Sequence, residues 1–242
     1  MSEIDYSIHY SRFHDDSENH AEKMANWMKS VLEPLVPTDR NSPVLDIGCG
    51  YGFALRALRN LGFSKLNGLE ISPQQAERCQ KAGFHVTVTS DTVGWLNENA
   101  GKYAFVVLLD VLEHIPIEHQ IDFVRAVHQV LRPGGEVFIT VPNANAILSP
   151  RWRYIDYTHY ASFTEHSLYF VLRNAGFENI KLDTEKGVGR FPRQLWKRES
   201  RLAVRKWLVR WCWLQVYKAE IPWEKLDQIS FELNLKAVAR KS

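Results

Sequence analysis

Short, largely apolar runs alternate with helical patterns along most of the chain. The apolar runs predict buried strands at residues 44–47, 65–71, 85–88, 103–109 and 136–141. The residues between them show the period of amphipathic helices. Strands that alternate with helices in this way predict an α/β fold, in which helices cover both faces of a mostly parallel sheet.

Local signals mark where several helices begin and end. Ser72 followed by Pro73 opens a helix, with serine as the N-cap and proline at the first helical position. The helix predicted at 117–131 is expected to close at the Pro-Gly-Gly turn of residues 133–135. Thr164 is expected to cap a further helix.

The pattern changes after the fifth predicted strand. Residues 177–183 predict a sixth strand, and 229–239 predict a last one. The segment 187–225 between them is basic and rich in tryptophan, and we interpret it as a helical insertion before the last strand.

Composition excludes several classes of protein. The 242 residues are 45% hydrophobic and 24% charged, which excludes disorder along most of the chain. No apolar run reaches the roughly 20 residues that span a bilayer, and the first residues are polar and acidic, unlike a signal peptide. Cys49, Cys79 and Cys212 are too few and too scattered for a disulfide framework. These features predict a reduced, cytoplasmic protein.

A glycine-rich turn follows the first predicted strand directly. Gly48, Gly50 and Gly52 let the backbone turn sharply and approach a ligand, and the next helix points its N-terminus at the same place. A dinucleotide-binding loop would need glycine where Phe53 stands, and a P-loop would need Gly-Lys-Ser/Thr. The turn therefore predicts a ligand other than a dinucleotide or a nucleoside triphosphate.

Residues 43–177 resemble the class I S-adenosylmethionine (SAM)-dependent methyltransferases, in five pieces that follow the family's order. Asp46 and the three glycines resemble the first motif, whose loop holds the methionine part of SAM. Glu70 resembles the acid that accepts hydrogen bonds from the ribose hydroxyls, and it lies about 20 residues beyond the loop, as a βαβ unit requires.

The other three pieces lie further along the chain. Asp91 stands where the family often has an acid near the adenine amine. Asp110-Val111-Leu112-Glu113-His114-Ile115 resembles the motif beside the transferred methyl group, and residues 131–135 resemble the turn before the fifth strand. The resemblance implies a Rossmann-like, seven-stranded, mostly parallel sheet with SAM as the cofactor. The implied cofactor-binding residues are Asp46, Gly48, Gly50, Gly52, Glu70, Ile71, Asp91, Asp110 and Val111.

This interpretation places one methyltransferase domain over residues 1–242. Its parts are an N-terminal helical lid at 1–36, a SAM-binding core at 43–183, the insertion at 187–225 and the last strand at 229–239. The resemblance suggests that His9, Tyr10 and His20 belong to a lid over SAM, although they could equally lie on a plain surface helix.

Methyl transfer to a hydroxyl group needs a base beside the cofactor. SAM supplies the activated methyl group, so the protein must align the acceptor and remove its proton, a task that suits histidine. His114 lies four residues after Asp110, so on a helix both would face the cleft. Asp156 and His159 belong to a D-x-T-H pattern that resembles a subfamily acting on sugars, quinols and other small hydroxyl compounds, which implies that they face the acceptor.

These side chains could also have purely structural roles. His114 and His159 could be structural histidines, and Asp156 could simply build a turn. Carboxylate and imidazole groups also suit divalent ions, but nothing in the spacing of the three residues requires a metal, and none is expected.

Positive charge is concentrated in the insertion. Residues 186–218 contain ten basic residues and one acidic residue, whereas the rest of the chain has 20 basic and 27 acidic residues. Four of the eight tryptophans, Trp196, Trp207, Trp211 and Trp213, lie in the same stretch. Three interpretations remain open: a helical cap with solvated arginines, a helix bound to an anionic membrane surface through 190–218, and contact with a polyanion.

We therefore expect a SAM-dependent methyltransferase that acts on a hydroxyl oxygen. A sugar in a surface glycan or lipid-linked intermediate is the first expected acceptor, and a quinol or other small phenol is the second. Asp110 is not followed by the Pro-Pro-aromatic motif of amino-group methyltransferases, which disfavours nucleic acid and protein nitrogen. A non-catalytic SAM-binding regulator also remains open. The expected location is the cytoplasm, at the inner face of the membrane if the insertion binds lipid.

Overall fold

The computed structural model describes residues 8, 11–15, 17–182, 198–224 and 229–242. The strands within these residues are β1 (Val44–Ile47), β2 (Leu66–Glu70), β3 (His85–Val88), β4 (Tyr103–Leu109), β5 (Leu131–Pro142), β6 (Glu178–Leu182) and β7 (Asn234–Arg240). The α-helices are α2 (Glu18–Leu32), α3 (Phe53–Asn60), α4 (Pro73–Lys81), α5 (Thr92–Glu98), α6 (Gln120–Val130), α7 (Ser149–Tyr154), α8 (Glu165–Asn174) and α9 (Arg198–Glu220). Two short 3₁₀ turns are η1 (Leu112–His114) and η2 (Ile117–His119).

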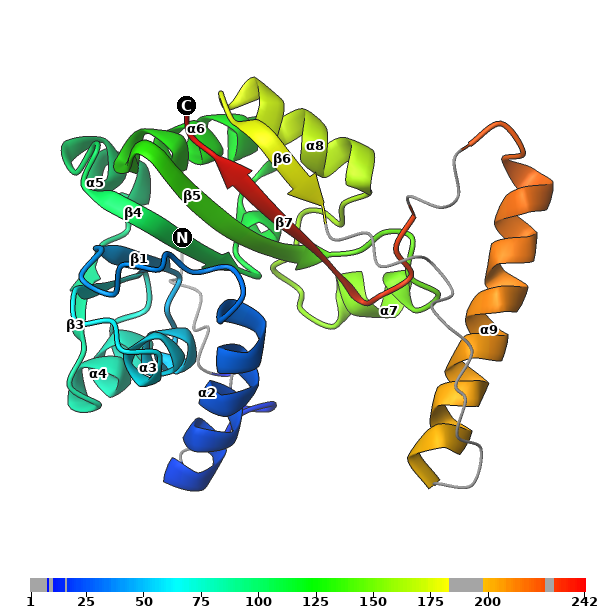
Figure 1. Ribbon diagram of the computed structural model, residues 1–242, viewed down its shortest axis with the longest axis horizontal. Coiled ribbons are helices and arrows are strands. Elements are labelled where there is room, and N and C mark those ends of the chain that lie inside the picture. The colour runs from blue at the N-terminus through cyan, green and yellow to red at the C-terminus, as the bar shows by residue number, and fades with distance from the viewer. Residues whose placement is uncertain (1–7, 9–10, 16, 183–197, 225–228) are drawn as a thin grey trace.

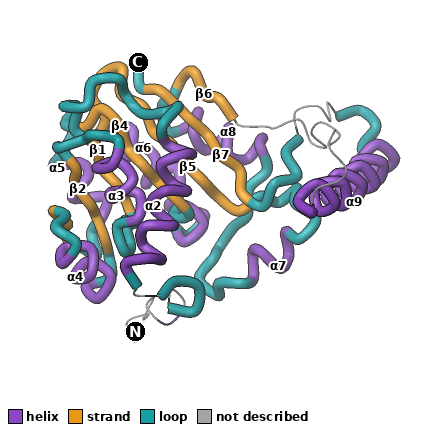
Figure 2. The backbone as a smooth tube through the Cα atoms, turned by 60° about the horizontal axis from the view of Figure 1, so that its bottom comes forward, coloured by secondary structure: helices purple, strands orange, loops and turns teal. Residues whose placement is uncertain are grey.

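These strands form one seven-stranded sheet in the order β3-β2-β1-β4-β5-β7-β6. β1 to β5 pair in parallel, and β7 runs antiparallel to both of its neighbours, β5 and β6. Helices cover both faces of the sheet (Figures 1 and 2). The predicted Rossmann-like, mostly parallel α/β fold is confirmed.

The central strands are buried on both faces, which explains their continuous apolar sequence. Successive residues of β4 point to opposite sides of the sheet. Phe105 and Val107 join one core cluster, while Val106 and Leu108 join the other. All four side chains have no exposed surface. The sheet is therefore held by a core on each side, and the carboxyl ends of β1, β2, β4 and β5 meet at one edge.

The predicted helix caps are present. The Ser72 side chain accepts a hydrogen bond from the backbone N–H of Gln75, with Pro73 at the first helical position. Thr164 and Ser167 cap each other reciprocally at the start of α8. These caps fix where α4 and α8 begin.

Three predicted elements have other boundaries in the structure. The helix over 117–131 is instead the turn η2 followed by α6, and β5 already begins at Leu131 rather than after residues 133–135. Leu131 is buried and pairs with Tyr103, so the Pro-Gly-Gly turn becomes an irregularity within the strand. The last strand begins at Asn234 instead of 229, because the Asn143 side chain donates to the carbonyls of residues 230 and 232 and holds them outside the sheet.

Two short helices had no clear signal in the sequence. α5 has seven residues and contains Gly94, whose presence lowers helix propensity. An added Cβ at Gly94 would lie 2.2 Å from Asp91 Oδ2, so glycine makes room for the Asp91 cap. α7 has six residues, too few to display a helical period.

Helix α2 lies against α3, and Arg56 of α3 pairs with Glu18 of α2. At the start of α2, the His14 and His20 rings lie 5.2 and 5.7 Å from the ring of Phe53, the first residue of α3. The N-terminal segment therefore reaches the glycine turn, although its role as a lid stays a prediction. His9 and Tyr10 lie outside the described residues.

The described part of the insertion is the long helix α9, which extends away from the sheet (Figures 1 and 2). Trp213 and Tyr217 donate hydrogen bonds to Asn145, and Arg210 pairs with Glu232 at 2.6 Å. Residues 187–197 and 225 of the predicted insertion lie outside the described residues. Among the helices of the described part, none combines the length and apolarity that crossing a membrane requires.

Candidate active site

The glycine turn packs directly against two neighbouring segments. Gly48 and Gly52 have φ angles of 70° and 78°, a region that favours glycine. An added Cβ at Gly48 would lie 2.5 Å from Val111 Cγ2, and one at Gly52 would lie 2.6 Å from Cys79 Sγ. The turn after β1 is therefore in contact with the turn after β4, as expected at the ligand-binding edge of an open α/β sheet.

Glu70 ties the end of β2 to the glycine turn. Its carboxylate accepts hydrogen bonds from the backbone N–H groups of Gly50, at 2.8 Å, and of Ile71 and Ser72, each at 2.9 Å. Burial raises the pKa of Glu70, and the three N–H groups counteract this effect. A carboxylate has about four acceptor positions, so one remains for a ligand hydroxyl group.

Asp46 is the second buried carboxyl group at this edge, with 2% of its surface exposed. Its pKa lies well above the usual range because of burial and, secondarily, because of the charge of Glu70. Two buried acids beside one turn favour a ligand that carries positive charge.

Asp110 is held in an unusual backbone conformation, with a φ of 52°. Its Oδ1 accepts hydrogen bonds from Thr140 Oγ1, at 2.9 Å, and from Asn234 Nδ2, at 2.8 Å. The expectation that Asp110 and His114 share one helical face is wrong, because Asp110 adopts the left-handed conformation and only the 3₁₀ turn η1 follows it. Strained residues of this kind concentrate at functional sites.

The remaining predicted cofactor residues lie near the same edge. Ile71 follows Glu70 and is 49% exposed. Asp91 is exposed, and its Oδ1 accepts a hydrogen bond from the Gly94 backbone at 2.8 Å, which caps α5. The structure thus gives Asp91 a local role, and its contact with adenine stays a prediction.

The three predicted catalytic residues lie together. Asp156 Oδ1 accepts hydrogen bonds from the backbone N–H of Thr158, at 2.8 Å, and from its hydroxyl, at 2.7 Å. Thr158 Oγ1 lies 2.8 Å from His114 Nδ1. Because the hydroxyl proton goes to Asp156, Oγ1 accepts from His114 Nδ1–H. His114 is therefore oriented by the chain Asp156–Thr158–His114, with the lone pair on Nε2.

His159 belongs to the same cluster. Its ring lies 4.6 Å from the ring of His114. His159 Nδ1 is 3.2 Å from the carbonyl oxygen of Arg153, which can only accept, so Nδ1 carries the proton and Nε2 carries the lone pair. The predicted neighbourhood of His114 and His159 is thus present in the structure, while their catalytic roles stay proposals.

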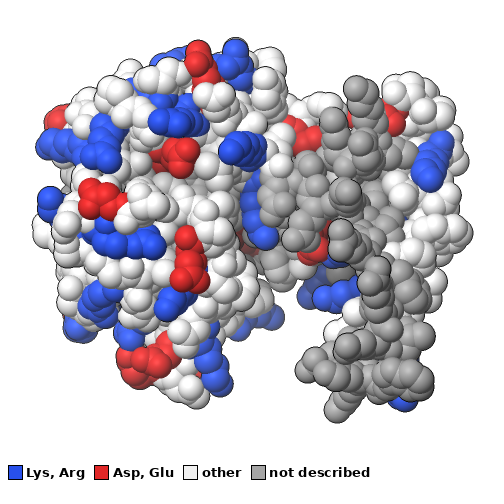
Figure 3. Space-filling view, viewed as in Figure 1, with Lys and Arg blue, Asp and Glu red and all other residues white. Residues whose placement is uncertain are grey.

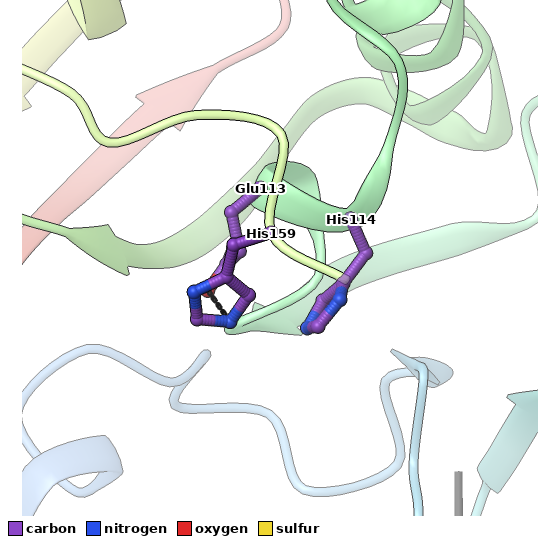
Figure 4. A group of neighbouring side chains, drawn as sticks. All are labelled: Glu113, His114 and His159. Atoms are coloured by element: carbon purple, nitrogen blue, oxygen red, sulfur yellow. Dashed lines mark ion pairs between the residues drawn. The ribbon is translucent and has the colours of Figure 1, made fainter. Parts of the chain in front are cut away.

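Two residues of the cluster were not singled out from the sequence. Thr158 links Asp156 to His114, and only its place in the D-x-T-H pattern hinted at this role. Glu113 has no exposed surface, and neither of its carboxylate oxygens has a hydrogen-bond partner. Its Oε1 lies 4.0 Å from His159 Nε2 (Figure 4). In the sequence Glu113 lies between Leu112 and His114, and this position alone did not indicate a buried carboxylate.

Comparison with known sequences and structures decides the family. The family described as methyltransferase domain matches residues 20–182, which is more than half of the chain. The chain is a class I SAM-dependent methyltransferase. A SAM-dependent methyltransferase from Archaeoglobus fulgidus has the same fold, with a TM-score of 0.69 at 19% identity, and the match covers 98% of this chain and 100% of that one.

Two further proteins are similar to this chain, one in sequence and one in fold. The ubiquinone biosynthesis O-methyltransferase of Escherichia fergusonii is 33% identical over 107 residues, which is 42% of this methyltransferase and 43% of the relative. The phosphoethanolamine N-methyltransferase 2 of Haemonchus contortus, solved with SAM, has a TM-score of 0.61 at 16% identity, covering 99% of this chain and 60% of that one. The matched region is thus less than half of the length of the curated relative. The family assignment makes SAM the cofactor of this methyltransferase.

The methyltransferase should not tolerate a side chain at Gly48. We expect Gly48→Ala to lower the free energy of unfolding by about 2–4 kcal/mol, because it adds backbone strain and a clash with Val111. Because the predicted cofactor contacts lie in this turn, affinity for S-adenosylhomocysteine (SAH) should also fall at least tenfold. Urea unfolding and titration calorimetry measure the two effects.

Gly101→Ala is the matched control for this substitution. Gly101 has a φ of 71°, but an added Cβ there meets nothing within 4 Å. Gly101→Ala should therefore lower the free energy of unfolding only by the backbone strain, about 1–2 kcal/mol, and leave SAH binding unchanged. Equal effects of the two substitutions would contradict the packing of the glycine turn against Val111.

Proposed function

We propose that this methyltransferase transfers the methyl group of SAM to a hydroxyl oxygen of a small organic molecule, a quinol or another phenol. The observation that carries the proposal is the oriented chain Asp156–Thr158–His114. It orients the imidazole of His114, which lies in the turn η1. Val111 precedes this turn and contacts the glycine turn at Gly48. A base beside the methyl group is what a hydroxyl acceptor needs and what an already nucleophilic amine does not.

The reaction proceeds by displacement at the methyl carbon. The acceptor oxygen forms a bond to this carbon while the carbon–sulfur bond of SAM breaks, which leaves an ether and SAH. The hydroxyl proton passes to the cluster of His114, His159 and Asp156, where the Nε2 atoms carry lone pairs. Proton removal of this kind contributes about 10²–10⁴-fold to a rate, and alignment of the acceptor contributes the rest.

The choice of acceptor draws on the relatives. The name of the Escherichia fergusonii relative specifies an O-methyltransferase of ubiquinone biosynthesis, which favours a quinol or phenol over a sugar. A sugar of a glycan or of a lipid-linked intermediate is the alternative acceptor. The N-methyltransferase from Haemonchus contortus shares the fold alone at 16% identity, so it carries no argument for an amine.

Transfer of radiolabelled methyl groups tests the acceptor class. The enzyme is incubated with labelled SAM and a cell lysate that is then separated into small-molecule, glycan, RNA and protein fractions, and in parallel with a panel of catechols, quinols and sugars. We expect label in phenolic compounds. Label in the glycan fraction would support the sugar alternative, and label in RNA or protein would overturn the hydroxyl assignment. SAH binding without any transfer would indicate a regulator.

We further propose that α9 contacts an anionic membrane surface. Leu202, Val209 and Val216 recur every seven residues on one side of the helix and are 58%, 53% and 47% exposed. The cations Arg201 and Arg205 are exposed on the same helix. On the face seen in Figure 3, basic and acidic side chains are interspersed over the sheet domain. Exposed apolar side chains can insert at a membrane interface while cations attract anionic lipid, although on α9 the two kinds are only weakly segregated.

Vesicle binding tests this contact. We expect the full chain to co-sediment with vesicles that contain anionic lipid and not with neutral ones. Reversing three cations of α9 (Arg201→Glu, Arg205→Glu and Lys206→Glu) should weaken binding at least 100-fold, since each lost cation contributes about 1 kcal/mol and each new carboxylate adds repulsion. The matched control reverses exposed Lys23, Lys65 and Lys102, which lie outside α9. Equal losses in both triple variants would contradict the assignment.

A further inference from the structure

Glu113 is the most unusual charged side chain of the site, because it is fully buried and both of its oxygens lack a hydrogen-bond partner. A buried carboxylate is costly unless it is paired, hydrogen-bonded or bound to a metal. The imidazole of His159 lies beside it, with Nε2 4.0 Å from Glu113 Oε1, too far for a hydrogen bond. Two lone-pair-bearing atoms therefore face each other across a gap.

His114 completes a set of three ligand groups. One ligand atom each from Glu113, His114 and His159 lie within 4.8 Å of one another. Figure 4 shows Glu113 and His159 side by side, with His114 next to them. Two ligands bound at about 2.1 Å to one ion lie about 3.0–3.4 Å apart, so small rotations of these side chains would bring them into range.

The second layer of contacts also fits a metal site. Histidines that bind a metal through one nitrogen almost always donate the other N–H to an oxygen. His114 Nδ1 donates to Thr158 Oγ1, at 2.8 Å, and His159 Nδ1 lies 3.2 Å from the carbonyl of Arg153. Asp110 is not part of this set, because its Oδ1 is bonded to Thr140 and Asn234.

We propose that Glu113, His114 and His159 bind one divalent transition-metal ion, of which zinc is the representative. Two imidazoles and one carboxylate are a ligand set that suits zinc and leaves coordination positions open for a substrate oxygen. The ion would balance the charge of the buried Glu113 carboxylate.

The role of the ion rests on the proposed function. An acceptor hydroxyl that coordinates zinc becomes acidic, as zinc-bound water does. Its O–H bond then breaks and the proton passes to solvent, after which the oxygen forms the bond to the methyl carbon and the sulfur leaves with its electron pair. No oxidation or reduction occurs. In this case His114 and His159 act as metal ligands, and the ion, rather than a histidine base, promotes deprotonation of the acceptor hydroxyl.

Metal binding by the tag-free, chelator-treated protein tests the site without any methyl acceptor. Titration calorimetry with ZnCl₂ should show one tight site per chain, and the cobalt-substituted protein should show visible absorption. Glu113→Gln and His159→Ala should weaken zinc binding at least 100-fold, while both variants still bind SAH. Thr158→Val should weaken it about 10–100-fold through the second layer of contacts.

His166→Ala is the matched control, because His166 lies with Glu165 and Glu224 in another group of potential ligands. It should leave the tight site intact. Absence of a tight site in the parent protein, or unchanged affinity in Glu113→Gln and His159→Ala, would overturn the proposal and leave the proposed function standing. Conversely, zinc binding without methyl transfer to any hydroxyl would overturn the function and leave the metal site.

Discussion

Glu70→Ala is expected to abolish SAM binding, with a loss of affinity of at least 100-fold. In the unmutated chain the Glu70 carboxylate accepts hydrogen bonds from the N–H groups of Gly50, Ile71 and Ser72. Each buried group left without a partner costs about 1–3 kcal/mol. The substitution therefore loosens the glycine turn and also removes the acceptor expected to bind the ribose hydroxyls.

Titration calorimetry with SAH measures this loss, and thermal unfolding reports the accompanying loss of stability. Glu70→Gln keeps the shape of the side chain and one carbonyl oxygen, so it should retain more stability than Glu70→Ala while still losing most of the SAH affinity. Asp91→Ala removes an exposed acid and the cap of α5, and its effect on affinity should be smaller. SAH affinity of Glu70→Ala within tenfold of the parent protein would contradict the cofactor site.

The fold was predictable because its determinants are local and repeated. The sequence of β4 is continuously apolar because the strand is buried on both faces of the sheet. Ser72 and Thr164 cap helices that begin at the next residue, so these signals are local in the sequence. The glycine turn was recognisable from three glycines within five residues, whereas its close contacts with the distant Val111 and Cys79 were not. The errors concern contacts between distant residues, such as Asn143 with residues 230 and 232.

The sequence predicted several residues of the candidate site but not how they are arranged. A motif identifies His114 as a candidate but does not reveal that Asp110 takes a φ of 52°. Because this conformation is not helical, the spacing of four residues does not place Asp110 and His114 on one helical face. A charged residue is expected at the surface, so the pattern gave no reason to bury Glu113 completely. Thr158 became important only because residues 156–159 fold back onto the turn after β4, where the Tyr160 N–H donates to the Glu113 carbonyl at 2.7 Å.

His114→Ala should leave SAM binding intact and lower kcat by about 10²–10⁴-fold, the usual contribution of proton removal. The substitution leaves the glycine turn, Glu70 and Val111 untouched, so the affinity for SAH should change less than threefold. Single-turnover measurements with a phenolic acceptor and labelled SAM separate the chemical step from binding. This expectation holds whether His114 acts as a base or as a metal ligand, because both roles use its Nε2 atom.

Thr158→Val distinguishes an oriented His114 from a merely adjacent one. Valine keeps the volume of threonine but removes the hydroxyl that accepts from His114 Nδ1 and donates to Asp156 Oδ1. The ring then loses its fixed tautomer, and kcat should fall about tenfold or more while SAH affinity is retained. Normal turnover in His114→Ala would show that the proton leaves elsewhere. Normal turnover in Thr158→Val alone would show that the position of His114, rather than its hydrogen-bonded chain to Asp156, is what the reaction requires.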